Sequence, residues 1–535
     1  MFKVIRFAPL VLAAILVLVG CSSTNTGAVS SSKATEGGVV TRAMTAEPAV
    51  IDPQDTAGSG LNLVLPYLFD TLVFRAKDGT FEPFLAEKWD VSPDGKSITF
   101  NLRKGVKFHD GSPLNAEAVA FTFKRFKATG TRSPIYTGIQ DIADVEVVDD
   151  LTVRFRFDRP SATFWTTVSM PYAAIMSPSA VQAAGSDFGR KPVGTGPFKL
   201  EQWSPGASIT LVRNPDYNWG PPAVKNKGPV RIDKLVFKLI PDATTQLAAL
   251  QAGEVDVIFI NDPGQLAQMK NDQTVQISIE TLDSLIYLGF NSAKAPFDDV
   301  PVRQALSYAV NKEEIIKTAL GGLGKEAATP LPPTVLGYNA DLKQFGQGYD
   351  PAKAKALLAE AGFAPAADGS WARDGKKLAG MLVTSTRAPN DAIATVIQSQ
   401  MKAIGVPVEI QQLDSAAVMK ATTEGKFDLL LWRYDWNDPD ALNIYLSSSR
   451  IRQTNRVFYG NKEVDALLER GRAELDPKVR IKTYYDAQKI ILSEAPWQPL
   501  YIPVEGLAYR NRLQGVVIGA LGRMLLNDVT VEGNK

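Results

Sequence analysis

At 535 residues the chain is too long for one compact core, and a typical domain length of about 150 residues predicts roughly three domains. Its residues are 45% hydrophobic and 21% charged, and its formal net charge is +1, so composition gives no basic surface for nucleic acid. A single histidine and a single cysteine exclude a multi-histidine metal site and an intramolecular disulfide.

Residues 1–20 have the pattern of a secretory signal peptide. Lys3 and Arg6 precede the apolar run LVLAAILVLVG, which is too short and too one-sided for a membrane-spanning helix. Removing this segment leaves 56 basic and 57 acidic side chains, or about −1 formally. No later apolar run is long enough to cross a bilayer, so we expect the mature chain to be a globule tethered at one end. The secretory signal places its work outside the cytoplasm.

The signal ends in LVGC (18–21), which resembles the lipobox of bacterial lipoproteins. This resemblance implies that Cys21 becomes the lipid-bearing N-terminus. The Ser/Thr/Gly-rich residues that follow predict a flexible tether over 21–35. The alternative is a chance cysteine at the end of an ordinary signal.

Six segments alternate between apolar and polar residues as strands do. They are 97–103, 152–157, 207–213, 254–260, 285–291 and 406–412. Between them lie helices with recognisable ends, and together these elements predict a mixed α/β protein. The clearest helix signals are Asp350 with Pro351 and Gly362, Asn390 with Gly405, and Asp476 with Pro477.

The sequence lacks the residues that the common catalytic and phosphate-binding motifs require. His109 lies in KFHDGSPLNAE, between a strand and a helix, and indicates a structural or surface imidazole. VGTGPFKL (193–200) contains Pro197 and leads into a strand, so it is not a dinucleotide loop. GGLGK (321–325) lacks the remaining residues of a phosphate loop. We therefore favour binding over catalysis, with no cofactor and no metal.

The segment LLLWRYDWNDPD (429–440) places aromatic and acidic residues directly after three leucines. A buried strand that ends in a polar aromatic loop often delivers side chains into a ligand cleft. The alternative is a strand followed by an ordinary Asn/Asp/Pro turn.

Seven stretches, covering nearly the whole mature chain, resemble bacterial extracellular solute-binding proteins of the peptide/nickel family, the receptors of dipeptide and oligopeptide ABC importers. These stretches are EPAVIDPQDT (47–56), EKWDVSPDGKSITFNLRKGVKFHDGSPLNAEAVAFTFKR (87–125), VGTGPFKLEQWSPGASITLVRNPDYNWG (193–220), LQAGEVDVI (250–258), LGFNSAKAPFDDVPVRQALSYAVNKEEII (288–316), DPAKAKALLAEAGF (350–363) and the 429–440 segment.

The resemblance implies an α/β, two-lobed periplasmic-binding-protein fold of type II, with an extra inserted domain and a ligand cleft between the lobes. By analogy, lobe I comprises 36–66, 191–283 and 504–535. The inserted domain comprises 67–190, and lobe II comprises 284–503.

The resemblance also implies site residues. An aspartate three residues after a tryptophan meets the ligand's ammonium in this family, which corresponds here to Asp435 after Trp432, and Trp432 and Trp436 would wall the pocket. The alternative for Asp435 is a turn-capping role.

The resemblance also implies residues for the rest of the ligand. Arg387 resembles the arginine that binds the ligand's carboxylate, with Arg433 as its rival and a solvated loop arginine as the alternative. Gly58 and Ser59 resemble a small-residue loop that touches the ligand.

These residues imply the substrate-binding component of an ABC importer, which captures short peptides and delivers them to the membrane permease. We expect a lipid-anchored monomer, periplasmic if the host is Gram-negative. The same fold binding an oligosaccharide or a metal chelate is the main alternative. A glycosidase that uses Asp435 with Asp438 or Asp440 is a more remote one.

Overall fold

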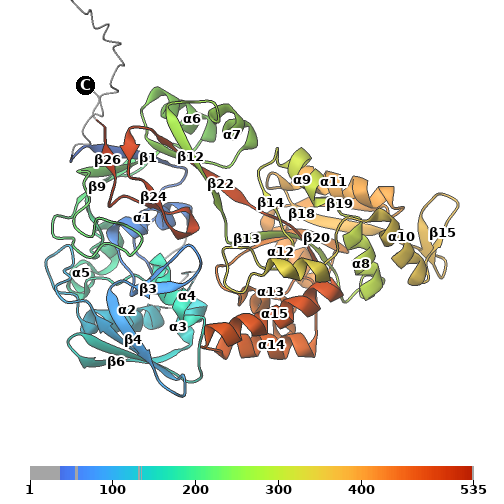
Figure 1. Ribbon diagram of the computed structural model, residues 1–535, viewed down its shortest axis with the longest axis horizontal. Helices are drawn as coiled ribbons and strands as arrows, with labels where there is room; N and C mark the ends of the chain where they lie inside the picture. The colour runs from blue at the N-terminus through green and yellow to red at the C-terminus, as the bar shows by residue number, and fades with distance from the viewer. Residues whose placement is uncertain (1–35, 55–57, 130–132, 134, 533–535) are drawn as a thin grey trace, which may run out of the picture. The chain divides into compact units, whose positions relative to one another are not determined.

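The structure is a computed structural model that describes residues 36–54, 58–129, 133 and 135–532. The predicted signal peptide, Cys21 and the tether all lie outside these residues. The chain from Ala34 onward forms one compact unit, and Figure 1 shows its elements in chain order. Three larger sheets organise this unit.

The first sheet has seven strands in the order β12-β22-β11-β1-β10-β9-β8. Strand β1 pairs in parallel with β10 and β11, and the other neighbours are antiparallel. The strands are β1 Val39–Met44, β8 Phe198–Ser204, β9 Ser208–Arg213, β10 Lys234–Leu239, β11 Val257–Ile260, β12 Val275–Thr281 and β22 Val504–Arg510. Helices α6 (Ala243–Ala252) and α7 (Pro263–Met269) lie beside β12 in Figure 1, and both contact β11.

The second sheet has six strands in the order β14-β21-β13-β20-β18-β19. These are β13 Ser284–Phe290, β14 Lys325–Glu326, β18 Gly380–Ser385, β19 Val408–Leu413, β20 Leu429–Asp435 and β21 Trp497–Ile502. Helices α14 and α15 run side by side in Figure 1, in the same part of the chain. The helices here are α8 Val300–Tyr308, α9 Lys312–Ala319, α10 Pro351–Glu360, α11 Asn390–Ala403, α12 Ser415–Glu424, α13 Ala441–Leu446, α14 Lys462–Ala473 and α15 Pro477–Glu494.

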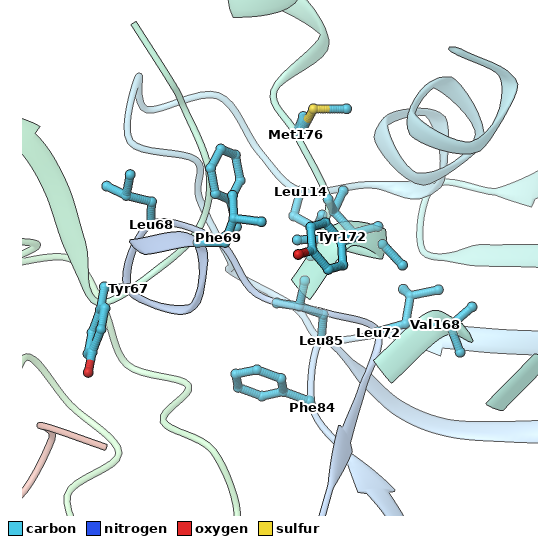
Figure 2. Packing of buried hydrophobic residues seen from close by; sticks show 14 of the residues in the cluster. Tyr67, Leu68, Phe69, Leu72, Phe84, Leu85, Leu114, Val168, Tyr172 and Met176 are labelled. Atoms are coloured by element: carbon cyan, nitrogen blue, oxygen red, sulfur yellow. The ribbon is translucent and has the colours of Figure 1, made fainter. Parts of the chain in front are cut away.

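A third, antiparallel sheet has the order β4-β5-β7-β6 and packs against α2 (Ala116–Thr129). Its strands are β4 Ala86–Val91, β5 Ser97–Leu102, β6 Ile142–Asp149 and β7 Thr152–Phe157. Short elements nearby are α1 Ser59–Leu68, β2 Val73–Arg75, β3 Phe81–Pro83, α3 Tyr136–Gln140, α4 Phe164–Ser169 and α5 Pro178–Ala184. One hydrophobic cluster joins this sheet to the first one, and Figure 2 shows part of it around Tyr172.

Each of these three sheets takes all its strands from one predicted part of the chain. The seven-stranded sheet uses the ranges assigned to lobe I, the four-stranded sheet the inserted range, and the six-stranded sheet the lobe II range. The boundaries between the parts stay a prediction, because contacts join Ala34–Lys535 into a single unit.

The chain passes between the first two sheets at two neighbouring places. Strand β12 continues through Leu282 and Asp283 into β13, and β21 continues through Pro503 into β22. The Leu282 amide donates to the Pro503 carbonyl at 3.1 Å, so the two connections run side by side. Arg75 anchors one of them through an ion pair of 2.9 Å with Asp283.

The predicted helix caps agree with the structure at two of the three helices. Asp350 caps α10 by accepting from the Lys353 amide at 2.9 Å, as the sequence predicts. Asp476 likewise caps α15, which begins at Pro477. The predicted cap at Asn390 is wrong, because Asn390 is already the first residue of α11 and its amide side chain donates to the Ser385 hydroxyl at 2.9 Å.

His109 is a structural histidine, one of the two roles that its place in the sequence indicates. Its Nδ1 accepts from the Gly194 amide at 3.3 Å, and its Nε2 lies 3.0 Å from the Gly196 carbonyl oxygen. Burial lowers the pKa of the imidazole to about 4, so the ring is neutral at pH 7. The ring therefore joins two loops and carries no charge.

Candidate functional site

Strand β20 runs through Asp435, so it includes residues that the sequence assigns to the polar aromatic loop after the three leucines. The extension is held by β13, which pairs antiparallel with β20 along its whole length and places Ser284 opposite Asp435. Leu429 and Leu431 bury one face of β20 in the hydrophobic core that packs on the six-stranded sheet. Because side chains alternate along a strand, Arg433 and Asp435 lie on this same face, beyond the core.

Asp435 combines exposure with fixed neighbours. Its carboxylate accepts from the Arg433 Nε at 2.9 Å and from the Ser284 hydroxyl, and its side chain is 56% exposed. No backbone amide of the described residues donates to it, so its contacts there are not those of a turn cap. A carboxylate held at a strand end and open to solvent can meet a cationic ligand group.

The charge of Asp435 also acts on a residue of the seven-stranded sheet. Glu505 lies near the start of β22, where Arg433, Arg42 and Asp435 all act on its charge. Burial raises the pKa of Glu505, the two arginines oppose this effect, and Asp435 adds to it. The carboxylates and guanidiniums of the two sheets thus form one electrostatic neighbourhood beside the connection at Pro503.

The two tryptophans do not share the Asp435 face. Trp432 alternates to the other face of β20, where it packs half-buried and the Arg456 guanidinium lies 5.6 Å from its ring centre. Trp436 follows the strand, is half-buried, and donates its backbone amide to the Asp283 carbonyl at 3.0 Å. Trp436 thereby fastens the end of β20 to the connection between the sheets.

Arg387 lies just beyond the end of β18 and is exposed. Among the described residues its guanidinium has no ion pair and no hydrogen bond, so it is available to a ligand. Burial raises the pKa of Tyr501 to about 12, and Arg433 and Arg387 oppose this shift. The charges of both arginines therefore act on Tyr501 of β21.

A cavity of about 340 Å³ lies against the seven-stranded sheet. It is lined by β1, α1, the 69–75 segment and the 519–527 segment, with Asn437 contributed from the loop after β20. Ser59 lines it, whereas the predicted Gly58 does not and instead precedes α1 with a φ of 152°. Glu505 lines the same cavity, whereas Asp435, Arg433 and Arg387 are not among its lining residues.

Asp438 and Asp440 do not join Asp435 at the site. Asp438 is 2% exposed and is held by Arg480 at 2.6 Å and by the Thr166 hydroxyl at 2.7 Å. Asp440 is 4% exposed and lies 3.0 Å from Arg472. A pair of glycosidase carboxylates must flank an open, sugar-sized gap. Asp438 and Asp440 are buried and form internal ion pairs, so they do not fit this arrangement with Asp435.

The pKa of Asp440 predicts a pH effect on stability. Burial raises this pKa to about 7, with Arg472 opposing the shift and Asp438 adding to it. The folded protein then keeps a proton that the unfolded chain releases above about pH 4, so the free energy of unfolding should fall between about pH 4 and 7 and level off above. Urea unfolding of Asp440→Asn should show a flatter pH dependence over this window. An unchanged dependence would contradict this assignment.

Three charged residues that line the cavity are not predicted from the sequence. They are Arg42, Glu505 and Arg523. Arg42 and Glu505 are charges inside the largely apolar strand segments VVTRAM and VEGLAYR, which is the one available signal for them. Arg523 lies in the irregular segment ALGRMLLND and gives no such signal. Only the fold brings these residues together.

Comparison with known families supports a binding function. Residues 80–453 match the family model described as bacterial extracellular solute-binding proteins, family 5 Middle. Among the described residues, no helix has both the length and the apolar character needed to span a bilayer.

Individual relatives cover most of the chain. The heme-binding protein A of Haemophilus influenzae is 34% identical over 503 residues, which are 89% of each chain. The dipeptide-binding protein of Escherichia coli is 34% identical over 515 residues, 91% of this chain and 93% of the relative. The solved structure of HbpA2 from Haemophilus parasuis superposes with a TM-score of 0.82 at 29% identity, covering 92% of this chain and 100% of that one.

Proposed function

Because this chain belongs to the bacterial extracellular solute-binding proteins of family 5, the peptide/nickel family, we propose that it captures short peptides and delivers them to an ABC importer. Proteins of this family are extracytoplasmic binding proteins for transport and not enzymes. The observation that carries the peptide proposal is Asp435, a half-exposed carboxylate fixed by Ser284 and Arg433 at the end of β20. A peptide's free ammonium is the group that such a carboxylate binds best in a closed, water-poor cleft.

We further propose roles for the surrounding residues. Arg387, free of partners among the described residues, would take the peptide's carboxylate through its planar guanidinium, with Arg433 as the alternative. Trp432 and Trp436 stiffen the strand end from its other face, and Ser59 contributes polar contacts from the cavity wall. Lobe I (36–66, 191–283 and 504–535), the insert (67–190) and lobe II (284–503) form the domains of this proposal, and the two side-by-side connections would be its hinge.

A metal chelate is the second candidate cargo. One relative is named a heme-binding protein, whereas another of equal identity is named a dipeptide-binding protein. An oligosaccharide is the weaker alternative, because the aromatic rings that would stack on a sugar are half-buried in packing contacts.

Calorimetric titration of the full chain, stripped of bound ligand by unfolding and refolding, tests the choice of cargo. We expect a mixture of alanine-based di- and tripeptides to bind with micromolar or lower dissociation constants, and hemin and maltotriose to bind much more weakly. Saturable binding of hemin without any binding of the peptides would contradict the peptide proposal.

We also propose that Cys21 anchors the mature protein to the cell membrane, on the strength of LVGC and the tether after it. Cys21→Ser should therefore give an unprocessed, unlipidated chain. Mass spectrometry and detergent partitioning of the parent and the variant check this, with Ser22→Ala as a matched control. A Cys21→Ser protein that is still processed and lipid-modified would rule the anchor out.

A further inference from the structure

The cavity beside the seven-stranded sheet is mostly apolar but contains cationic groups. Its wall includes side chains that suit an aliphatic or aromatic ligand group, among them Met44, Leu63, Phe74, Phe84, Phe259 and Met524. Three arginines also line it, of which Arg75 is paired with Asp283 at 2.9 Å, leaving Arg42 from β1 and Arg523 from the C-terminal segment. Charged groups are rare in apolar surroundings unless they are paired, so the partners of both arginines decide what the cavity can bind.

Arg42 is 2% exposed and has no carboxylate within ion-pair distance among the described residues. Its guanidinium lies 4.6 Å from the ring centre of Phe259, and its Nη1 donates to the Tyr67 hydroxyl at 3.2 Å. Its Nε has no acceptor in the described part of the chain. Glu505 acts on the charge of Arg42 only from a distance. Arg42 is therefore a buried cation that neutral groups hold in place.

The guanidinium of Arg523 has fewer polar partners than that of Arg42. In the described chain its guanidinium makes neither an ion pair nor a hydrogen bond. The nearby carboxylate of Asp283 is already paired with Arg75 at 2.9 Å, so it adds no net negative charge. Burial, reinforced by the like charge of Arg75, lowers the pKa of Arg523 to about 10, which still leaves it charged at pH 7.

One hydroxyl links the two arginines. The Tyr67 hydroxyl receives the Arg42 hydrogen bond and donates at 2.8 Å to the backbone carbonyl of Met524, the residue after Arg523. Figure 2 shows the Tyr67 side chain pointing away from Leu68 and Phe69, at one edge of the drawn part of the hydrophobic cluster to which it belongs. The strand that carries Arg42 and the segment that carries Arg523 are thus held at one place in the cavity wall.

The cavity's own acids do not neutralise Arg523. Asp70 already accepts from Thr195, Trp219 and Tyr217, and burial raises its pKa to about 6. The charges of Arg433 and Arg42 act on Glu505, and in the described part of the chain Glu505 makes neither an ion pair nor a hydrogen bond with Arg523. An anionic group of a ligand would therefore supply the counter-charge that Arg523 does not have among the described residues.

We propose that Arg523, supported by Arg42, binds a side-chain carboxylate of the ligand, which makes this protein selective for peptides that contain an acidic residue. The inference rests on the proposed peptide function and adds a second carboxylate-binding subsite, separate from Arg387. A planar guanidinium binds a carboxylate through two parallel hydrogen bonds, and the apolar wall accommodates the methylenes of a glutamate. Glutamine has the same shape without the charge, so it is the matched comparison.

The test is calorimetric titration of the full chain with six tripeptides, in which glutamate or glutamine occupies each position of an otherwise all-alanine sequence. At one position or more, the parent should prefer glutamate by at least about tenfold, which corresponds to about 1.4 kcal/mol. In Arg523→Gln this preference should disappear, while affinity for the glutamine peptide changes by less than about threefold. Arg523→Lys should keep part of the preference, and the exposed Arg156→Gln should keep all of it.

Two results would overturn this inference alone. One is equal binding of glutamate and glutamine peptides by the parent at all three positions, a comparison that needs no variant to fold. The other is a preference that survives in a folded Arg523→Gln protein, whose fold circular dichroism and thermal melting verify. Failure of all six peptides to bind would instead overturn the proposed peptide function, and this inference with it.

Discussion

Replacing Asp435 with asparagine should weaken the binding of free short peptides by roughly two to four orders of magnitude. The substitution keeps the shape of the side chain but leaves the ligand's ammonium without its counter-charge in the closed cleft. Breaking a desolvated ion pair in this way costs about 3–5 kcal/mol, and each 1.4 kcal/mol is one order of magnitude in the dissociation constant. Titration calorimetry of parent and variant measures the loss.

Asp414→Asn is a matched control for this effect. Asp414 follows β19 in the same sheet and caps α12 by accepting from the Ala417 amide at 2.9 Å, a role that asparagine fills nearly as well. Its substitution should leave affinity unchanged. If Asp435 were only a capping residue, Asp435→Asn would behave like this control.

N-acetylation of the ligand identifies the group that Asp435 meets. Acetylation should weaken binding to the parent strongly but to Asp435→Asn only slightly, because the same interaction has already been lost. Additive losses in the four combinations would show that Asp435 does not touch the ammonium.

Replacing Arg480 with methionine should lower the free energy of unfolding by about 3–5 kcal/mol, since it leaves the buried carboxylate of Asp438 without its counter-charge. The pair is 2.6 Å apart, and the two side chains are 5% and 3% exposed. Burial alone would raise the pKa of Asp438, but the charge of Arg480 and hydrogen bonds, including one from Thr166, hold it below its usual value. Denaturant unfolding measures the loss.

Two further variants separate lost charge from lost packing. Asp438→Asn combined with Arg480→Met removes the stranded charge and should recover part of the stability. Lys482→Met, on the same helix, breaks an exposed pair with Asp486 and should cost less than about 1 kcal/mol. Equal losses for Arg480→Met and Lys482→Met would contradict the importance of the buried pair.

Local signals in the sequence predict much of the secondary structure. The strand predicted at 152–157 matches β7, and Asp350 with Pro351 marks the start of α10, because alternation and capping depend on neighbouring residues only. The end of β20 could not be predicted this way. Its last residue pairs with Ser284, 151 positions earlier, so long-range register decides it.

The candidate site shows the same limit. Asp435, Arg387 and Ser59 can be named from motifs, but the roles of Arg42 and Arg523 depend on Tyr67 and on a cavity that distant segments form. Asp438 and Asp440 look like ligand-site acids beside Asp435 in the sequence. They are internal because Arg480 and Arg472, supplied by α15 and α14, pair with them.

The identity of the cargo tests the central claim most directly. The full chain, extracted from its own cells in detergent and purified without unfolding, should release its ligand on acid denaturation for identification by mass spectrometry. We predict short peptides with free amino termini. Recovery of heme, another metal chelate or a sugar, with no peptide, would contradict the account.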